Sequence, residues 1–364
     1  MVLKELLAAI EEMAPFSLQE DYDNSGLQIG SSGQEVTGCI ICLDINEQVV
    51  EEAARHGSNL IISHHPLIFK GIKRIADKTA TERIIKKALK EDLAICSVHT
   101  NLDNAWNGVN RILGEKLGLT GLSVLRKPSG MLKKLATYCP AAHAGRVRQA
   151  LFDAGAGHIG GYDQCSFNLT GQGTFRGGEA TNPFVGEKGH LHFEEEVRIE
   201  TIFPAYRKES VVEALLCAHP YEEVAYDIYS LENEYDRAGA GMIGHLPEPT
   251  DEKVFLAQVK DILKIPVIRH SPLLGKPLRR VAICGGSGSF LIQDAIRMQA
   301  DIFLTADIKY HQFFEADGKI VIADAGHFET EQFTCGLIAA YLKKKFPTFA
   351  IRISETLANP VNYF

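Results

Sequence analysis

Histidines and carboxylates follow directly after several apolar, strand-like runs of this sequence. The runs are NLII, DLAICSV, DIFLTA and KIVIADAG, and the polar residues that come after them are His64 and His65, His99 and Asp103, Asp307 and His311, and His327 and Glu331. In open α/β sheets, ligands bind at the carboxyl ends of the strands. We therefore expect these side chains to meet at one edge of one sheet.

Imidazole nitrogens and carboxylate oxygens bind zinc and related first-row ions. His327 and Glu331 are four residues apart, so on a helix that starts near Gly326 they share one face and Glu331 reaches two ions. His64 and His65 are adjacent, and their side chains diverge in an extended backbone, which suits two neighbouring ions. With Asp103 these residues make five ligands for two metals, few enough that water completes each shell, as in catalytic sites.

Each of these motifs alone has a simpler explanation. A helical His-x-x-x-Glu is usually a surface pair, and His-His-Pro is usually a turn. The metal hypothesis depends on their combination at one sheet edge. His99 and His311 are candidates for proton transfer or for supporting a ligand through a hydrogen bond.

Three further residues are weaker candidates for contacting a substrate: Asp23, Asn24 and Asp307. Asx-turn chemistry explains Asp23 and Asn24 almost as well. The glycine-rich segment CGGSGSF (284–290) is interpreted first as a tight strand-to-helix connection and second as a phosphate cradle, because it lacks the Gly-Lys-Ser/Thr of a Walker A loop.

Composition narrows the class of protein. The 364 residues carry a formal net charge of -8, which argues against a general nucleic-acid or acidic-membrane surface. The chain has no uninterrupted apolar stretch of membrane-spanning length, and MVLKELLAAIEEM is an acidic amphipathic helix rather than a leader peptide. Its eight scattered cysteines are typical of reduced thiols. We expect a cytoplasmic protein.

The outer segments have an α/β texture. Runs such as GCIICLD, NLIISHH and DLAICSV predict buried strands, with helices at 46–56 and 79–91 between them. The pattern returns in RRVAICGG, ADIFLTAD and GKIVIADAG, followed by a helix from about 327 to 345. We interpret residues 1–126 and 237–364 as two halves of one split α/β domain with a parallel sheet.

The middle segment, 127–236, has a different pattern. It predicts strands at 132–139, 160–169, 194–203 and 223–231 and helices at 143–155 and 208–218, with a long hairpin loop at 171–190. The order β-α-β-β-α-β indicates an inserted ferredoxin-like α+β domain.

Five motifs in order resemble the Nif-three-like family, whose members are often named GTP cyclohydrolase I type 2 homologues. They are DYDNSGLQIG, LIISHHPLIF, VHTNLDNAWNGVN, TADIKYHQ and DAGHFETE, and they span both outer segments. The resemblance implies metal ligands at His64, His65, Asp103, His327 and Glu331, the five reached above. AHPYEEVAYDIY (218–229) is similar to the end of the PII-like or CutA-like insert of longer bacterial members. The family resemblance also implies a toroidal homohexamer that is capped by this insert.

Three functions compete at this point. The first is a metal-dependent GTP cyclohydrolase that opens the purine ring of a small-molecule substrate, such as a nucleotide. It would hold two divalent ions per subunit. Zinc is the expected metal, with manganese, iron or cobalt as alternatives. The second is a two-metal phosphoesterase or amidohydrolase. The third is a non-catalytic assembly that senses a metabolite or handles metal.

Overall fold

The computed structural model describes residues 1–356 and 359–363. The chain divides into two compact units. The first combines Met1–Arg126 with Arg237–Phe364, and the second is Lys127–Asp236.

One sheet of the first unit is built mainly from parallel strands with short apolar sequences. Its strand order is β1-β4-β3-β2-β15, in which only β1 is antiparallel to its neighbour. The strands are β1 (Gly26–Ile29), β2 (Gly38–Cys42), β3 (Leu60–Ser63), β4 (Ala94–Ser97) and β15 (Ala350–Ile353). Every residue of β2, β3 and β4 is buried, which explains why these strands are continuous apolar runs.

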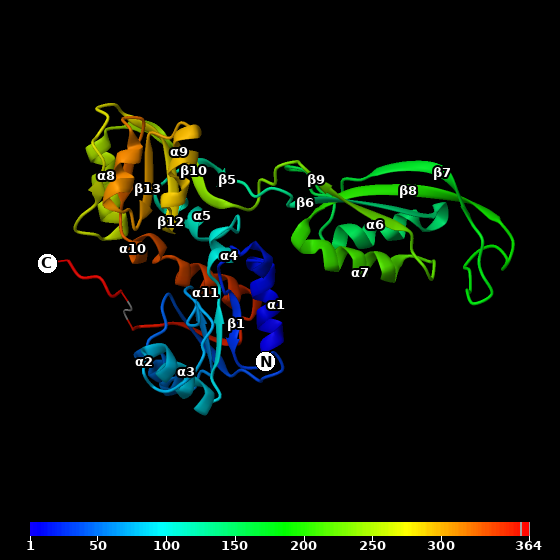
Figure 1. Ribbon diagram of the computed structural model, residues 1–364, viewed down its shortest axis with the longest axis horizontal. Coiled ribbons are helices and arrows are strands. Elements are labelled where there is room, and N and C mark those ends of the chain that lie inside the picture. Colours follow the sequence, from blue (N-terminus) through cyan, green and yellow to red (C-terminus); the bar gives the residue numbers. More distant parts are fainter. Residues whose placement is uncertain (357–358, 364) are drawn as a thin grey trace. The chain divides into compact units, whose positions relative to one another are not determined.

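Helices cover this sheet. Residues of α2 (Glu47–Arg55) and α3 (Ala80–Lys90) form one hydrophobic core with Ile40, Ile61 and Ile95 of the strands. The long helix α11 (Thr334–Lys345) contacts β2 and β15, and α1 (Leu3–Met13) contacts α11 (Figure 1).

A second sheet of the same unit has the order β11-β14-β13-β12-β10-β5. Its central strands β12, β13 and β14 are parallel, and the remaining pairs are antiparallel. The strands are β5 (Thr120–Arg126), β10 (Ala240–Thr250), β11 (Arg269–His270), β12 (Leu278–Ser287), β13 (Ile302–Ala306) and β14 (Val321–Asp324). The helices in the same stretches of chain are α4 (Thr100–Asp103), α5 (Val109–Lys116), α8 (Glu252–Leu263), α9 (Ile292–Arg297) and α10 (His327–Glu331).

The prediction of a single parallel sheet was wrong. β5 comes from the first segment but pairs with β10 of the second sheet, and β15 comes from the C-terminal end but pairs with β2 of the first sheet. Each segment therefore contributes a strand to the other's sheet. Apolar runs indicate which residues are buried strands, but they carry no information about which strands pair.

The predicted helix from about 327 to 345 is interrupted. It consists of α10 and α11, with Gln332 and Phe333 between them. The Gln332 side-chain amide donates to the carbonyl oxygen of Glu329 at 2.8 Å. In a continuous helix, this oxygen would accept the backbone N–H of the residue four positions later, so the side chain takes the place of a helical hydrogen bond.

The second unit has the element order β6-α6-β7-β8-α7-β9. Its elements are β6 (Leu132–Pro140), α6 (Ala144–Asp153), β7 (Phe167–Phe175), β8 (His192–Pro204), α7 (Lys208–Ala218) and β9 (Tyr226–Leu231). The strands form one antiparallel sheet in the order β7-β8-β6-β9. α6 and α7 lie along one face of it, around a core that includes Leu135, Ile199 and Phe203 (Figure 1).

The strand predicted at 160–169 lies later in the chain, at Phe167–Phe175. Gly171 and Gly173, which we assigned to a loop, pair with Glu196 and Glu194 of β8. Glycine usually weakens a strand interior, so its presence indicates a loop unless a neighbour requires the space. Here a neighbour does, because a Cβ on Gly173 would lie 2.0 Å from a carboxylate oxygen of Glu196.

Short 3-10 helices connect several elements: η1 (Phe16–Leu18), η2 (Ala141–His143), η3 (Ala205–Arg207), η4 (Ser289–Leu291) and η5 (Tyr310–Ala316). Within the described ranges, no helix is both long enough and apolar enough to cross a bilayer.

Glu52 of α2 forms hydrogen bonds with the segment that follows β15. The residue is 2 % exposed, and its carboxylate accepts hydrogen bonds from the Ser354 hydroxyl at 2.6 Å and from the Glu355 N–H at 2.8 Å. Burial opposes ionisation, but these donors outweigh it and lower the pKa of Glu52.

We expect Glu52→Ala to reduce the free energy of unfolding by about 2–4 kcal/mol near pH 7, since it leaves several donors without an acceptor. A lowered pKa means that the stabilisation is present above the usual carboxyl pKa and is lost as the pH falls through the folded value. Urea denaturation at neutral and acidic pH measures both effects. Glu51→Ala, which removes only an exposed ion pair with Lys87, is the matched control. Equal losses in the two variants would contradict the anchoring role.

Candidate metal centre

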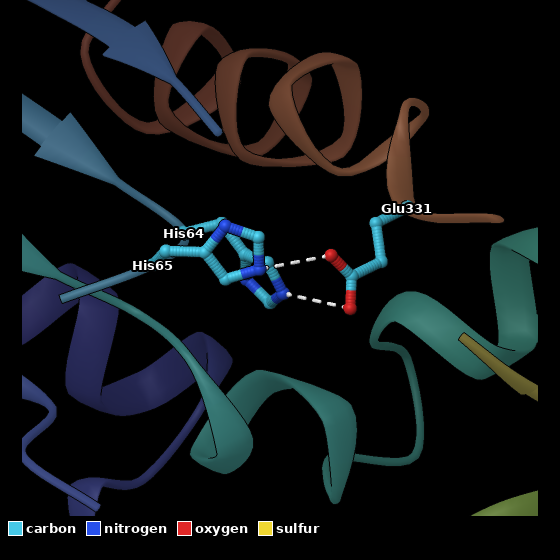
Figure 2. Close-up of side chains that lie close together, drawn as sticks. All are labelled: His64, His65 and Glu331. Atoms are coloured by element: carbon cyan, nitrogen blue, oxygen red, sulfur yellow. Dashed lines mark ion pairs between the residues drawn. The ribbon is translucent and has the colours of Figure 1, made fainter. Parts of the chain in front are cut away.

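Two adjacent histidines face one carboxylate inside the first unit. His64 and His65 follow the last residue of β3, and Glu331 ends α10 (Figure 2). The Nε2 atom of His64 lies 3.7 Å from Oε1 of Glu331, and Nε2 of His65 lies 3.0 Å from Oε2. One ligand atom from each of the three residues lies within 4.8 Å of the others, and the group can hold a metal ion.

Asp103 and His327 lie beside these three residues. Oδ1 of Asp103 is 3.7 Å from Nε2 of His64. Nε2 of His327 is 3.2 Å from Oε2 of Glu331 and 3.2 Å from Nε2 of His65. Ligand atoms that are each about 2.0–2.1 Å from one ion are about 3–4 Å from one another, so the spacing suits coordination. The structure thus brings together all five residues to which the sequence analysis assigned metal binding.

The other ring nitrogen, Nδ1, of each histidine has an oxygen partner. Nδ1 of His64 lies 2.8 Å from the carbonyl oxygen of Val98, Nδ1 of His65 lies 2.9 Å from Asp44, and Nδ1 of His327 lies 2.7 Å from Asp307. A hydrogen bond at Nδ1 fixes the ring orientation and leaves Nε2 for a metal, as in proteins where a carboxylate supports a histidine ligand.

Sequence reasoning missed Asp44. It follows the apolar run of β2 directly after Leu43, just as His64 follows β3. The rule that selects polar residues after buried strands therefore also points to Asp44, which stands at the end of the apolar run GCIICLD.

Two polar atoms at the centre are buried and have no hydrogen-bond partner among the described residues. They are Nε2 of His64 and Oδ1 of Asp103. Buried polar groups are nearly always paired, and an unpaired one costs free energy. These two atoms lie 3.7 Å apart, beside the Glu331 carboxylate, and a cation would satisfy both, so the residues present fit a metal.

The electrostatics of the cluster favour the protonated form of two imidazoles. Burial opposes the charged form, but the neighbouring carboxylates outweigh it and raise the pKa of His65 to about 10 and that of His327 to about 11. Burial also opposes ionisation of Glu331, but the surrounding imidazoles lower its pKa well below the usual value. For Asp103, burial dominates and raises the pKa.

The glycine-rich segment 284–290 makes room for these ligands. Gly286 has a φ of 60°, and a Cβ there would lie 2.2 Å from Oε1 of Glu331. The N–H groups of Gly285 and Gly286 donate to Asn110 and Thr330 at 2.9 and 3.0 Å. These donors are already used within the fold, which favours the strand-to-helix connection over the phosphate cradle.

His99 lies beside the cluster and is held by Asp23. Its ring centroid is 5.4 Å from those of both His64 and His65, and its Nδ1 lies 2.7 Å from Oδ1 of Asp23. The Asp23 side chain is fully buried and also accepts the N–H of Thr100 at 3.1 Å. Burial opposes its ionisation, but the hydrogen bonds from His99 and Thr100 outweigh it and lower the pKa of Asp23.

The remaining candidates differ in their placement. Asp307 follows β13 and accepts hydrogen bonds from His327 and from the Ser287 hydroxyl, which lower its pKa. Asn24 is exposed and donates to the carbonyl oxygen of Ile68, so it holds a loop. His311 is exposed on η5, and its described ring contacts are with Tyr310 and Phe314 rather than with the cluster.

Two cavities reach the centre. One of about 740 Å³ is lined by His65 and His327, together with Arg269, Phe328 and Tyr363. The other, of about 240 Å³, is lined by Asp103, His99 and Glu331, with Tyr22 and Phe290. The larger volume is within the range of small-molecule sites.

A mixed α/β fold in which histidines after the strands face a buried glutamate of a short helix defines a candidate metal-binding protein. The chain belongs to the DUF34/NIF3 family, because the model for Duf34/NIF3 (NGG1p interacting factor 3) matches residues 1–360. This finding confirms the resemblance drawn from the five motifs.

Relatives and solved structures support this assignment. A protein of Halalkalibacterium halodurans named GTP cyclohydrolase 1 type 2 homolog is 42% identical over 325 residues, which cover 88% of this chain and 87% of the relative. One of the same name from Bacillus subtilis is 37% identical, over 99% of this chain and 98% of its own. The crystal structure of a Bacillus cereus protein related to NIF3 has a TM-score of 0.88 at 39% identity, and covers 100% of this chain and 99% of that one.

Zinc binding to the metal-free protein is expected to release protons at neutral pH. His65 and His327 have pKa values of about 10 and about 11, so both carry a proton that the metal must displace. Apparent affinity should therefore rise as the pH rises from about 6 to about 8. Calorimetric titration in buffers of different ionisation enthalpy measures the released protons, and binding that is independent of pH would contradict this charge state.

Removing the support of a ligand should weaken zinc binding without abolishing it. We expect Asp44→Asn and Asp307→Asn each to lower zinc affinity by roughly 10–100-fold, because a neutral amide replaces the carboxylate that orients the histidine and strengthens it as a ligand. Competition with a chelating dye measures the change. Asp261→Asn, on the exposed side of α8, is the matched control and should leave the affinity unchanged. Unchanged affinity in Asp44→Asn would show that His65 does not depend on that carboxylate.

Proposed function

We propose that this protein is a metal-dependent hydrolase with a dinuclear centre, and that it acts as a cyclohydrolase on GTP or a related purine. The observation that carries the proposal is the position of Glu331, whose two carboxylate oxygens face two different groups of donors. Oε1 lies 3.7 Å from His64, while Oε2 lies 3.0 Å from His65 and 3.2 Å from His327.

In this proposal the donors divide between two ions. His64, Asp103 and Oε1 of Glu331 would hold the first, and His65, His327 and Oε2 would hold the second. Three protein donors per ion leave positions for water and substrate, as in catalytic rather than structural sites. Histidine and carboxylate donors suit zinc best, with manganese, iron and cobalt as alternatives.

When bound, two such cations would lower the pKa of a nearby water and polarise the bond under attack. In the proposed reaction water adds to C8 of the purine and the bond from C8 to N9 breaks, which leaves a formamide on N7. A second water then cleaves the bond from C8 to N7, which releases formate and leaves N7 as an amine. The name carried by the relatives, GTP cyclohydrolase 1 type 2 homolog, motivates this choice among hydrolytic reactions.

His99 is the group we propose for proton transfer. The low pKa of Asp23 keeps that carboxylate ionised, so Nδ1 of His99 donates to it and Nε2 is left to accept a proton. His99 lines the cavity of about 240 Å³ together with Asp103 and Glu331. A proton acceptor therefore lies at the wall of the same cavity as two of the proposed ligands.

We further infer that residues 127–236 are an inserted ferredoxin-like domain. The element order β6-α6-β7-β8-α7-β9 and the strand order β7-β8-β6-β9 support this inference. The homohexamer expected from the family resemblance is part of the same proposal.

The test is hydrolysis of GTP by the zinc-loaded protein. Formate release is expected, and Glu331→Ala and His64→Ala should abolish it, because each removes a ligand. His99→Gln should slow it by about a hundredfold with metal content unchanged. His56→Gln, on an exposed residue at the end of α2, is the matched control.

The alternatives give different results in the same assay. Phosphate release from phosphoester substrates, without formate from GTP, would indicate a two-metal phosphoesterase, and amine release from amides an amidohydrolase. No turnover of any substrate by fully loaded protein would favour a non-catalytic role in metabolite sensing or metal handling. Loss of formate release in His311→Gln but not in His99→Gln would exchange the roles of these two histidines.

A further inference from the structure

The second unit has a cavity on the face of its sheet that the helices leave open. The cavity has a volume of about 590 Å³, within the range of small-molecule sites. It is formed by β7, β8, the end of β6, the loop after β7 and the segment that leads into β9. Its lining includes Tyr138, Phe175, Phe184, Glu196, Arg198 and Tyr221.

A carboxylate is buried in this cavity without a cation. Glu196 is 9 % exposed, and its Oε1 accepts a hydrogen bond from the Tyr221 hydroxyl at 2.8 Å. Across residues 1–356 and 359–363, no Lys, Arg or His nitrogen is recorded within ion-pair distance of it. Burying an unpaired carboxylate costs roughly several kcal/mol of free energy. A buried carboxylate without a cation is therefore rare unless a ligand supplies the positive charge.

The strand opposite Glu196 is shaped around its carboxylate. Gly171 pairs directly with Glu196, and a Cβ on Gly173 would lie 2.0 Å from Oε2 of Glu196. Neither glycine has a positive φ, so backbone conformation does not require them. They leave space above the sheet beside the carboxylate, at a cost in strand stability.

Aromatic rings surround the same space. The ring centroid of Tyr221 is 6.0 Å from that of Phe175 and 6.3 Å from that of Phe184, with interplanar angles of 59° and 50°. Parallel rings would form a slot for a flat heterocycle, whereas rings tilted against one another form a box. A box of aromatic rings with a carboxylate is the environment that binds ammonium groups, since ring faces and the carboxylate both attract positive charge.

The other charged groups that line the cavity do not cancel this preference. Arg198 is held by Glu200 at 2.7 Å and lies over the ring of Tyr138, and Glu200 also pairs with Lys134. Arg176 lines the cavity as well, and the two arginines are outnumbered by the three carboxylates Glu196, Glu222 and Glu223. The nearby carboxylates Glu196 and Glu194 contribute, together with burial, to the raised pKa of Tyr221, which keeps its hydroxyl a donor.

We propose that this cavity binds a small organic cation, with its ammonium group enclosed by Phe175, Phe184 and Tyr221 and paired with the carboxylate of Glu196. The site lies wholly in residues 127–236 and shares no residue with the metal centre. The proposal therefore goes beyond the hydrolase function and does not depend on it.

The test compares two probes of the same shape in calorimetric titrations of the full-length protein. Choline carries a quaternary ammonium, and 3,3-dimethyl-1-butanol replaces its nitrogen by carbon and is neutral. We expect choline to bind with a dissociation constant of about 1 mM or lower and the neutral alcohol to bind at least about tenfold more weakly. Equal binding of the two probes, or no binding of choline at about 20 mM, would overturn the proposal.

Variants locate the binding to this cavity. Glu196→Gln should weaken choline binding by at least about tenfold, and Phe184→Leu, at a residue that is 51% exposed, should weaken it several-fold. Glu213→Gln, on the exposed side of α7 at the opposite face of the sheet, is the matched control and should bind choline normally. Unchanged binding in both cavity variants would place the cation elsewhere and overturn the assignment.

Stability without ligand provides a second readout. Glu196→Gln removes an unpaired buried charge and keeps an acceptor for Tyr221. The melting temperature of the variant should therefore equal or exceed that of the parent protein. Choline should raise the melting temperature of the parent protein only. If Glu196→Gln instead changes the oligomeric state and choline binds to neither protein, a side chain of a second copy occupies the cavity and the small-ligand proposal fails.

Discussion

The candidate metal centre depends on one buried carboxylate that faces imidazoles on two sides. Glu331 is 3 % exposed, and its two oxygens lie opposite His64 and opposite the pair His65 and His327. A carboxylate in that position is stable only when positive charge surrounds it, from protonated imidazoles or from cations. The raised pKa values of His65 and His327 and the lowered pKa of Glu331 express the same constraint in the metal-free protein.

The architecture follows from the need to bring these groups together. His64 and His65 leave β3 of one sheet, whereas His327 and Glu331 follow β14 of the other. β5 and β15 each cross into the sheet of the opposite segment, which ties the two sheets into one unit. Gly286 completes the arrangement, because any side chain at that position would occupy the space of the Glu331 carboxylate.

The two units differ in the groups that surround their buried carboxylates. In the metal centre, Asp44, Asp307 and the carbonyl oxygen of Val98 hold one nitrogen of each histidine and leave the other for a cation. In the cavity of the second unit, Glu196 has a tyrosine hydroxyl, aromatic rings and space left by glycines, but no cation among the described residues. The first environment selects a metal ion by its donor atoms, and the second selects an organic cation by its apolar walls.

The sequence alone determined the family, the α/β character of the outer segments and the set of residues that converge at the centre, because burial and strand ends leave a local pattern of apolar runs followed by polar residues. It failed where the outcome depended on partners distant in the chain. Asp44 acquired a role only through His65, Gly171 and Gly173 became part of a strand only beside Glu196, and the single predicted sheet became two because strand pairing joins residues hundreds of positions apart, such as Ile351 and Cys39. Local periodicity records which residues are buried, whereas the tertiary structure decides which buried residues meet.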